Sequence, residues 1–145
     1  WWEERGYETW HDLREEALNI LQRESELQQI VKLVGPDALP DDQRLTLETA
    51  RLLREGFLQQ NALHDVDAYA SVDKQMRMLR LMLHFHHRAQ RIIAKGCPVT
   101  VLRALPVVNI ILRMKETIAG EEIERIEDIK RTLDEQMDDV EEDYA

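Results

Sequence analysis

Hydrophobic residues recur every three or four positions along most of the chain, a spacing that places them on one face of an α-helix. A first helix is predicted over residues 9–34. It ends at Gly35 and Pro36, because glycine accepts a left-handed backbone and proline cannot extend a helix. A second helix is predicted over residues 40–59, where an initial proline costs nothing because that N–H would be unpaired anyway. The two helices would form a stiff antiparallel pair joined by the turn 35–43.

The rest of the chain repeats the helical pattern. A third helix is predicted over residues 72–95, with shorter helical stretches near 98–104 and 107–117. The last helix, predicted over 121–140, carries a narrow apolar stripe, and its other faces are charged. No segment alternates convincingly with the period of a strand. We therefore expect an all-α fold, a bundle of about five helices forming a single domain over residues 1–145.

Composition and charge exclude several function classes. The net charge is −10, which argues against general nucleic-acid binding. No apolar stretch approaches the ~20 residues of a membrane span. Residues 72–115 hold one acid and nine bases, whereas residues 116–145 hold 13 acids and three bases. The expected partner of the basic middle is thus the chain's own acidic last helix.

Candidate catalytic and metal-binding residues are few. The sequence contains no GxxxxGK[ST], GxGxxG or HExxH motif, so the chain lacks the parts for phosphoryl transfer on its own. The single Cys97 excludes an internal disulfide and fits a small buried hydrophobe. His84 and His87 share a helix face and could ligate a metal, but Arg88 and Arg91 stand where further ligands would be needed. The preferred interpretation is a partly exposed helix face with no metal.

Several colinear segments resemble a known family. The stretch LQQIVKLVGPDALPDDQRL (residues 27–45), followed by REGFLQQNA (54–62) and VDAY (66–69), resembles the C-terminal domain of the catalytic A subunit of archaeal and bacterial A/V-type rotary ATPases. ALPVVNIILRMKETI (104–118) is similar to a Leu-Pro-Val … Arg-Met-Lys stretch of that family. The resemblance covers nearly the whole chain. It implies that the P-loop lies in an upstream domain of a longer chain, which agrees with a first residue, Trp1, that is not an initiator Met.

The resemblance assigns a partner to the turn between the first two helices. In the family this turn faces the central rotor shaft, which implies central-stalk contacts for Asp37, Ala38, Leu39, Pro40, Asp41 and Asp42. The related F-type β subunit carries a more acidic loop at this place. Because Ala, Pro and Gln replace some of those acids here, a steric push is expected rather than a charge-specific contact.

The far end of the second helix is implied to line the adenine pocket. The family residues correspond here to Phe57, Gln60, Asn61, Ala62 and Leu63. Leu63 replaces an aromatic residue of the family, so it offers apolar contact and no stacking on adenine. For Phe57, plain core packing is an equally good interpretation.

As a whole, the resemblance implies an ATP synthase or ATPase that translocates protons or sodium ions, with ATP or ADP and Mg²⁺ bound by the parent subunit. The chain alone is expected to bind no cofactor and to be inactive. The implied partners are non-catalytic B subunits and central-stalk subunits, in a cytoplasmic head peripheral to the membrane. The alternative from the residues alone is a free-standing α-helical interaction module, suggested by the segregated charges and the methionines of 72–95.

Overall fold

The computed structural model describes residues 7–58, 72–118 and 124–145, and the regular elements in those residues are all helical. The α-helices are α1 (Tyr7–Val34), α2 (Asp41–Leu53), α4 (Val72–Ala94), α5 (Val99–Arg103), α6 (Pro106–Thr117) and α7 (Glu124–Asp143). A 3-10 turn, η2 (Pro36–Ala38), precedes α2, and a π-helical segment, η3 (Arg54–Leu58), follows it. The all-α prediction is confirmed, with six α-helices in the described part of the chain where about five were expected.

The predicted helix boundaries hold to within a few residues, with one difference in kind. The second helix was expected to continue as an α-helix to residue 59, but from Arg54 to Leu58 the backbone is π-helical. A Cβ added at Gly56 would lie 2.8 Å from Met82 Cε and 3.5 Å from Leu112 Cα. The missing side chain thus lets this widened turn approach α4 and α6 closely.

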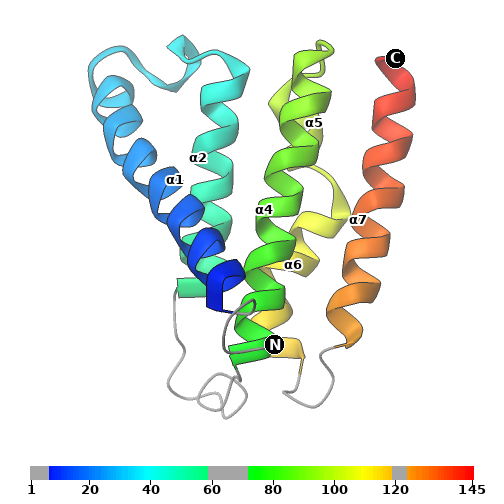
Figure 1. Cartoon of the computed structure of the whole chain (residues 1–145). Helices are drawn as coiled ribbons and strands as arrows, with labels where there is room; N and C mark the ends of the chain where they lie inside the picture. Colours follow the sequence, from blue (N-terminus) through cyan, green and yellow to red (C-terminus); the bar gives the residue numbers. More distant parts are fainter. Residues whose placement is uncertain (1–6, 59–71, 119–123) are drawn as a thin grey trace.

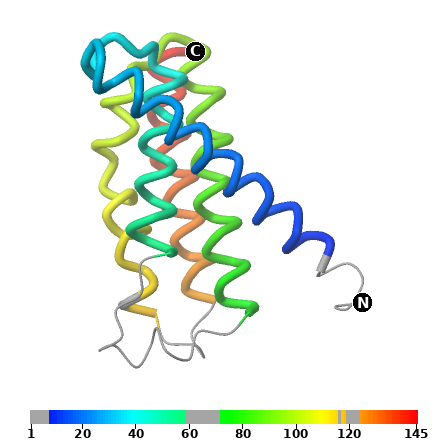
Figure 2. Tube along the Cα trace, turned by 90° about the vertical axis from the view of Figure 1, so that its left-hand side faces the viewer, coloured from blue at the N-terminus to red at the C-terminus, as the bar shows by residue number. Residues whose placement is uncertain are grey.

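Helices α2 and α4 pack side by side at the centre of the molecule, and α7 packs against α4 (Figure 1). Helix α1 contacts both α2 and α4, and it is inclined to the other helices (Figure 2). Helix α6 contacts α4, α7 and η3, whereas the short α5 contacts α2 and α4. Within residues 7–58, 72–118 and 124–145, no helix is both long and apolar enough to traverse a bilayer.

The core forms where α2, α4, α6 and α7 meet, and α4 supplies its largest share. The buried apolar side chains of α4 include Met78, Leu79, Met82, Leu83, Phe85 and Ile92. The facing helices add Leu45, Leu52, Leu53, Ile111, Met114, Ile126, Leu133 and Met137. Burial of this contiguous apolar surface is what stabilises the bundle.

Two helix starts in the second half are capped by side chains from distant elements. The N-cap residues of α5 and α6 make no side-chain capping hydrogen bond of their own. Instead, Val99 N donates to Asp41 Oδ1 at 3.3 Å, and Val107 N donates to Gln136 Oε1 at 3.1 Å. The first amides of both helices are therefore satisfied only when α2 and α7 have docked.

Candidate functional site

The corner between α1 and α2 lies at one end of the molecule, the end that also carries the α4–α5 turn and the C-terminus (Figure 1). Gly35 ends α1 with a φ of 88°, a left-handed conformation that favours glycine. The corner leaves four of the predicted central-stalk residues exposed, namely Asp37, Ala38, Pro40 and Asp42. These residues remain candidates for contact with a partner.

The other two predicted central-stalk residues hold the corner in place. Leu39 is 6 % exposed, so its side chain packs into the fold. Asp41 is partly buried and accepts the hydrogen bond from Val99 N described above. The corner is thus an exposed tip on a fixed base. Sequence reasoning placed the turn but could not separate the tip from the base, because their residues alternate between positions 37 and 42 and both include an aspartate and an apolar residue.

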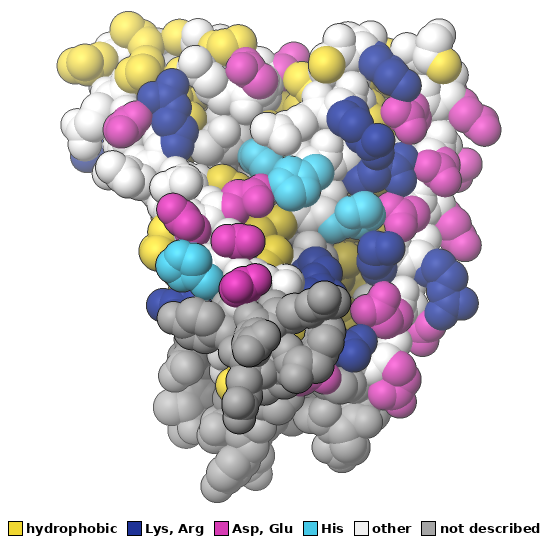
Figure 3. Space-filling view, viewed as in Figure 1, with side chains coloured by type: hydrophobic (Ala, Val, Ile, Leu, Met, Phe, Trp, Pro, Cys, Tyr) yellow, Lys and Arg dark blue, Asp and Glu magenta, His cyan; other side chains and the backbone are white. Residues whose placement is uncertain are grey.

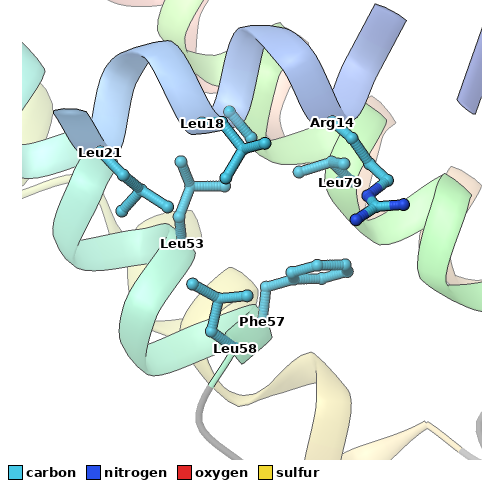
Figure 4. A pocket seen from close by; sticks show the side chains of 8 residues that line it. Arg14, Leu18, Leu21, Leu53, Phe57, Leu58 and Leu79 are labelled. Atoms are coloured by element: carbon cyan, nitrogen blue, oxygen red, sulfur yellow. The ribbon is translucent and has the colours of Figure 1, made fainter. Parts of the chain in front are cut away.

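The predicted adenine-side end begins at η3, at the opposite end of the molecule (Figure 1). Phe57 is half-buried, and Leu58 is 52 % exposed. Both line an apolar cavity of about 110 Å³ with side chains of α1, α2 and α4 (Figure 4). Gln60, Asn61, Ala62 and Leu63 lie outside the described residues. Of the predicted adenine-side residues, the structure therefore places Phe57, which lines a cavity and also packs against the core.

Two buried lysines stand near this end, and sequence reasoning missed both. Lys115 in α6 is 8 % exposed, and its Nζ donates to the carbonyl oxygen of Phe57 at 2.7 Å. Lys74 in the first turn of α4 is fully buried, and its Nζ donates to the carbonyls of Ile118 and Lys115. The available signal was a lysine at a position on the apolar face of each predicted helix, where a charged group needs a specific partner.

The histidines of α4 pair with other side chains. His84 Nε2 donates to Asp134 Oδ1 at 2.7 Å, and His87 Nε2 hydrogen-bonds to Glu16. His86 Nδ1 and Thr49 Oγ1 are joined at 2.6 Å in the core. Burial, and next the neighbouring His87, lower the pKa of His86 to about 4, so it is neutral at pH 7. Within the described residues no group of three or more histidine, cysteine or carboxylate side chains could hold a metal.

Basic side chains of α4 face acidic side chains of α7, as the charge segregation predicted (Figure 3). Arg88 binds Asp134 at 2.9 Å, Asp138 at 2.8 Å and Glu141 at 3.4 Å. Lys95 binds Glu141 at 2.8 Å. Partial burial raises the pKa of Asp134, but hydrogen bonds from His84 and then Arg88 outweigh it and leave the pKa below its ordinary value. The prediction that the basic middle pairs with the last helix is confirmed.

A family model described as the C-terminal domain of V and A type ATP synthase matches residues 1–101 of the chain. The chain belongs to this family. The match includes the α1–α2 corner and η3, and it continues into α5. The resemblance that the sequence suggested is therefore confirmed.

Relatives within the ATP synthase family extend the match beyond the family model. A protein of Methanopyrus kandleri, named as the A subunit of an A-type ATP synthase, is 50 % identical over 97 % of this chain and 24 % of its own length. Proteins of the same name from Methanococcus vannielii and Thermococcus sibiricus are 51 % and 46 % identical, over 79 % and 85 % of this chain. The chain thus spans 20–24 % of the length of these relatives.

Proposed function

We propose that this chain is the C-terminal helical domain of the catalytic subunit of a rotary ATP synthase or ATPase that translocates protons or sodium ions. In this role it transmits movement between a nucleotide site and the rotating central stalk. The observation that carries the proposal is the position of the corner and η3 at opposite ends of one element, α2 (Figure 1). This separation supports the proposed role because the chain belongs to the family of C-terminal domains of V and A type ATP synthases.

The physical basis is a stiff arm between the two ends. At 1.5 Å per residue, α2 and η3 together span roughly 25 Å, and α1 spans roughly 40 Å. The side chains of Leu45, Leu52 and Leu53 are fully or almost fully buried, so α2 is held along its length by α4 and α1. Packed helices transmit displacement because well-packed interiors deform little. A push on the exposed tip, formed by Asp37, Ala38, Pro40 and Asp42, would then reach η3.

At the η3 end, Phe57, Gln60, Asn61, Ala62 and Leu63 would contribute the adenine side of the nucleotide site. The half-burial of Phe57 beside an apolar cavity supports this placement, because adenine is a flat and largely apolar group. The phosphates of ATP or ADP and their Mg²⁺ would be held by a P-loop in another domain of the parent subunit. Residues 1–145 would then be one domain that is inactive by itself.

The proposed partners are the central-stalk subunits at the tip and non-catalytic B subunits around the domain. The domain would sit in the head of the complex, on the cytoplasmic side and peripheral to the membrane. Its net charge of −10 gives no support to a nucleic-acid partner.

The experiment is made in the complete ATPase complex and alters only the exposed tip. Asp37, Pro40 and Asp42 are replaced by Gly, with the anchoring Leu39 and Asp41 retained. Ion transport per ATP hydrolysed is expected to fall severalfold, because the tip becomes shorter and more pliable. ATP affinity is expected to stay within about twofold, because the altered tip lies at the opposite end of α2 from η3, where the nucleotide site is proposed.

The matched control is a double substitution on the exposed face of α7, Glu135→Ala with Asp139→Ala, which also removes two negative charges. It should leave transport per ATP unchanged. If the tip variant lost ATP affinity and coupling together, the assignment of an arm with separate ends would be wrong.

A further inference from the structure

Lys115 and Lys74 meet near the η3 end, and the proposed function leaves both unexplained. Each carries a charge in the interior, where an ammonium group is costly unless acceptors surround it. Their acceptors include backbone carbonyls from elements distant in sequence. A lysine that donates a hydrogen bond to a carbonyl of another element fixes the position of that element's backbone.

Lys115 acts on the last turn of η3. Its Nζ lies 2.7 Å from the carbonyl oxygen of Phe57, which is 58 positions away in the chain. The last carbonyls of a helical segment lack partners within the helix, and a cation placed there complements their partial negative charge. A charge-assisted hydrogen bond is stronger and shorter than a neutral one. Lys115 therefore holds the end of η3 from α6.

Lys74 supports the element that carries Lys115. Its Nζ donates to the carbonyl of Ile118, the C-cap residue of α6, and to that of Lys115 at 3.5 Å. Gly56 adds a second contact between η3 and α6, since a Cβ there would lie 3.5 Å from Leu112 Cα and 3.6 Å from the Ile111 oxygen. The backbone of Phe57 is thus fixed relative to both α4 and α6.

We infer that Lys115 is a positioning residue for the adenine side of the nucleotide site, and that Lys74 supports it. The inference rests on the proposed function, which puts Phe57 beside the adenine. Phe57 is the last residue but one of η3, so a hydrogen bond that fixes its carbonyl also fixes where its side chain stands beside the apolar cavity. Lys115 needs no contact with the nucleotide for this role, because its ammonium acts through the Phe57 backbone.

The experiment compares Lys115→Met with Lys115→Arg in the complete ATPase complex. Lys115→Met keeps an unbranched side chain and removes the donor. It should raise KM for ATP about three- to tenfold and change kcat by less than about twofold. The rise in KM is smaller than the full contribution of a charge-assisted hydrogen bond, because Lys115 acts on the nucleotide only through Phe57. Preference for ATP over GTP should fall, because the altered contacts are those to the adenine ring. Lys115→Arg should recover much of both, since its N–H groups reach the same acceptor.

Two further variants separate this role from a loss of stability and from a failure of the proposed function. Ile126→Val removes one methylene from the core of α7 and should lower stability while leaving KM and base preference unchanged. Phe57→Ala tests the adenine side directly. A raised KM in Phe57→Ala with no change in Lys115→Met would overturn the role of Lys115 alone. Unchanged KM in both would overturn the adenine-side placement, and the inference with it.

Discussion

Helices α1 and α4 are both long and amphipathic, yet they are buried to very different extents. Helix α4 has 23 residues, of which 12 are buried, whereas the apolar residues buried in the 28-residue α1 are Ala17, Ile20 and Leu27. Leu33 is 85 % exposed and Val34 is 63 % exposed at the end of α1 nearest the corner. Apolar periodicity therefore predicts a helix, while the number of neighbours decides how much of it is buried.

The reason lies in where each helix sits. Helix α4 packs against α1, α2, α5, α6 and α7, so nearly every side has a neighbour. Helix α1 contacts α2, α4 and η2, and it is inclined away from the bundle (Figure 2). The molecule thus has two parts: a packed body formed by α2, α4, α5, α6 and α7, and the less covered helix α1, which leads into the corner. Substitutions should affect the two parts unequally.

The largest contrast is expected between buried and exposed leucines. Leu133 in α7 is fully buried, and Leu133→Ala should cost about 2–5 kcal/mol because it leaves a cavity. Leu33→Ala in α1 should stay within about 0.5 kcal/mol, because Leu33 is already in contact with solvent. Urea denaturation of the two variants at pH 7 measures the difference. Equal losses would mean that α1 is covered as fully as the body.

The contact between α2 and α4 should depend on pH through His86. Its pKa is lowered to about 4 in the folded protein, against 6.5 for an ordinary histidine. Between pH 6.5 and 4 the unfolded state binds a proton that the folded state does not, so stability falls as the pH falls. The loss is about 3 kcal/mol over this range, with none from His86 above pH 6.5.

Denaturation curves at several pH values between 7 and 4 test this expectation. His86→Gln keeps a polar side chain toward Thr49 but does not titrate, so its stability should fall less steeply in this window. Carboxylates such as Asp134 titrate in both proteins and cancel in the comparison. Parallel curves for the two proteins would show that His86 is not the source of the slope.

The smallest contrast concerns two arginines of the packed body, Arg88 between α4 and α7 and the more exposed Arg51 of α2. Arg88→Met should cost about 1–3 kcal/mol, because the Arg88 side chain is 9 % exposed and its loss leaves Asp134 partly buried with one partner fewer. Arg51→Met should cost no more than about 0.5 kcal/mol, because the Arg51 side chain is 32 % exposed and pairs with Glu48 of α2 and Glu55 of η3 on adjacent turns.

Melting temperatures at low and high salt distinguish the two arginines. The Arg51 effect should shrink further as NaCl is added, because exposed pairs are screened, whereas most of the Arg88 effect should remain. An Arg88→Met variant as stable as the parent would show that the ion pairs between α4 and α7 add nothing to the packing of the body.

Much of the fold could be predicted from the sequence. The periodicity gave the all-α class and the approximate extent of the helices, and Gly35 and Gly96 marked two ends, both with positive φ. The charge segregation predicted that α4 would pair with α7. For the candidate site, the pattern located the corner. It could not show that Leu39 and Asp41 anchor the corner while Asp37 and Asp42 stay exposed.

What the sequence determined by itself is the set of helices, because a helix is closed by hydrogen bonds between residues four apart and its apolar face repeats over the same short distance. Only the tertiary structure decided the close approach of Gly56, the remote caps from Asp41 and Gln136, and the hold of Lys115 on Phe57. These features join residues tens of positions apart. No local pattern records such partners, which meet only when the helices pack.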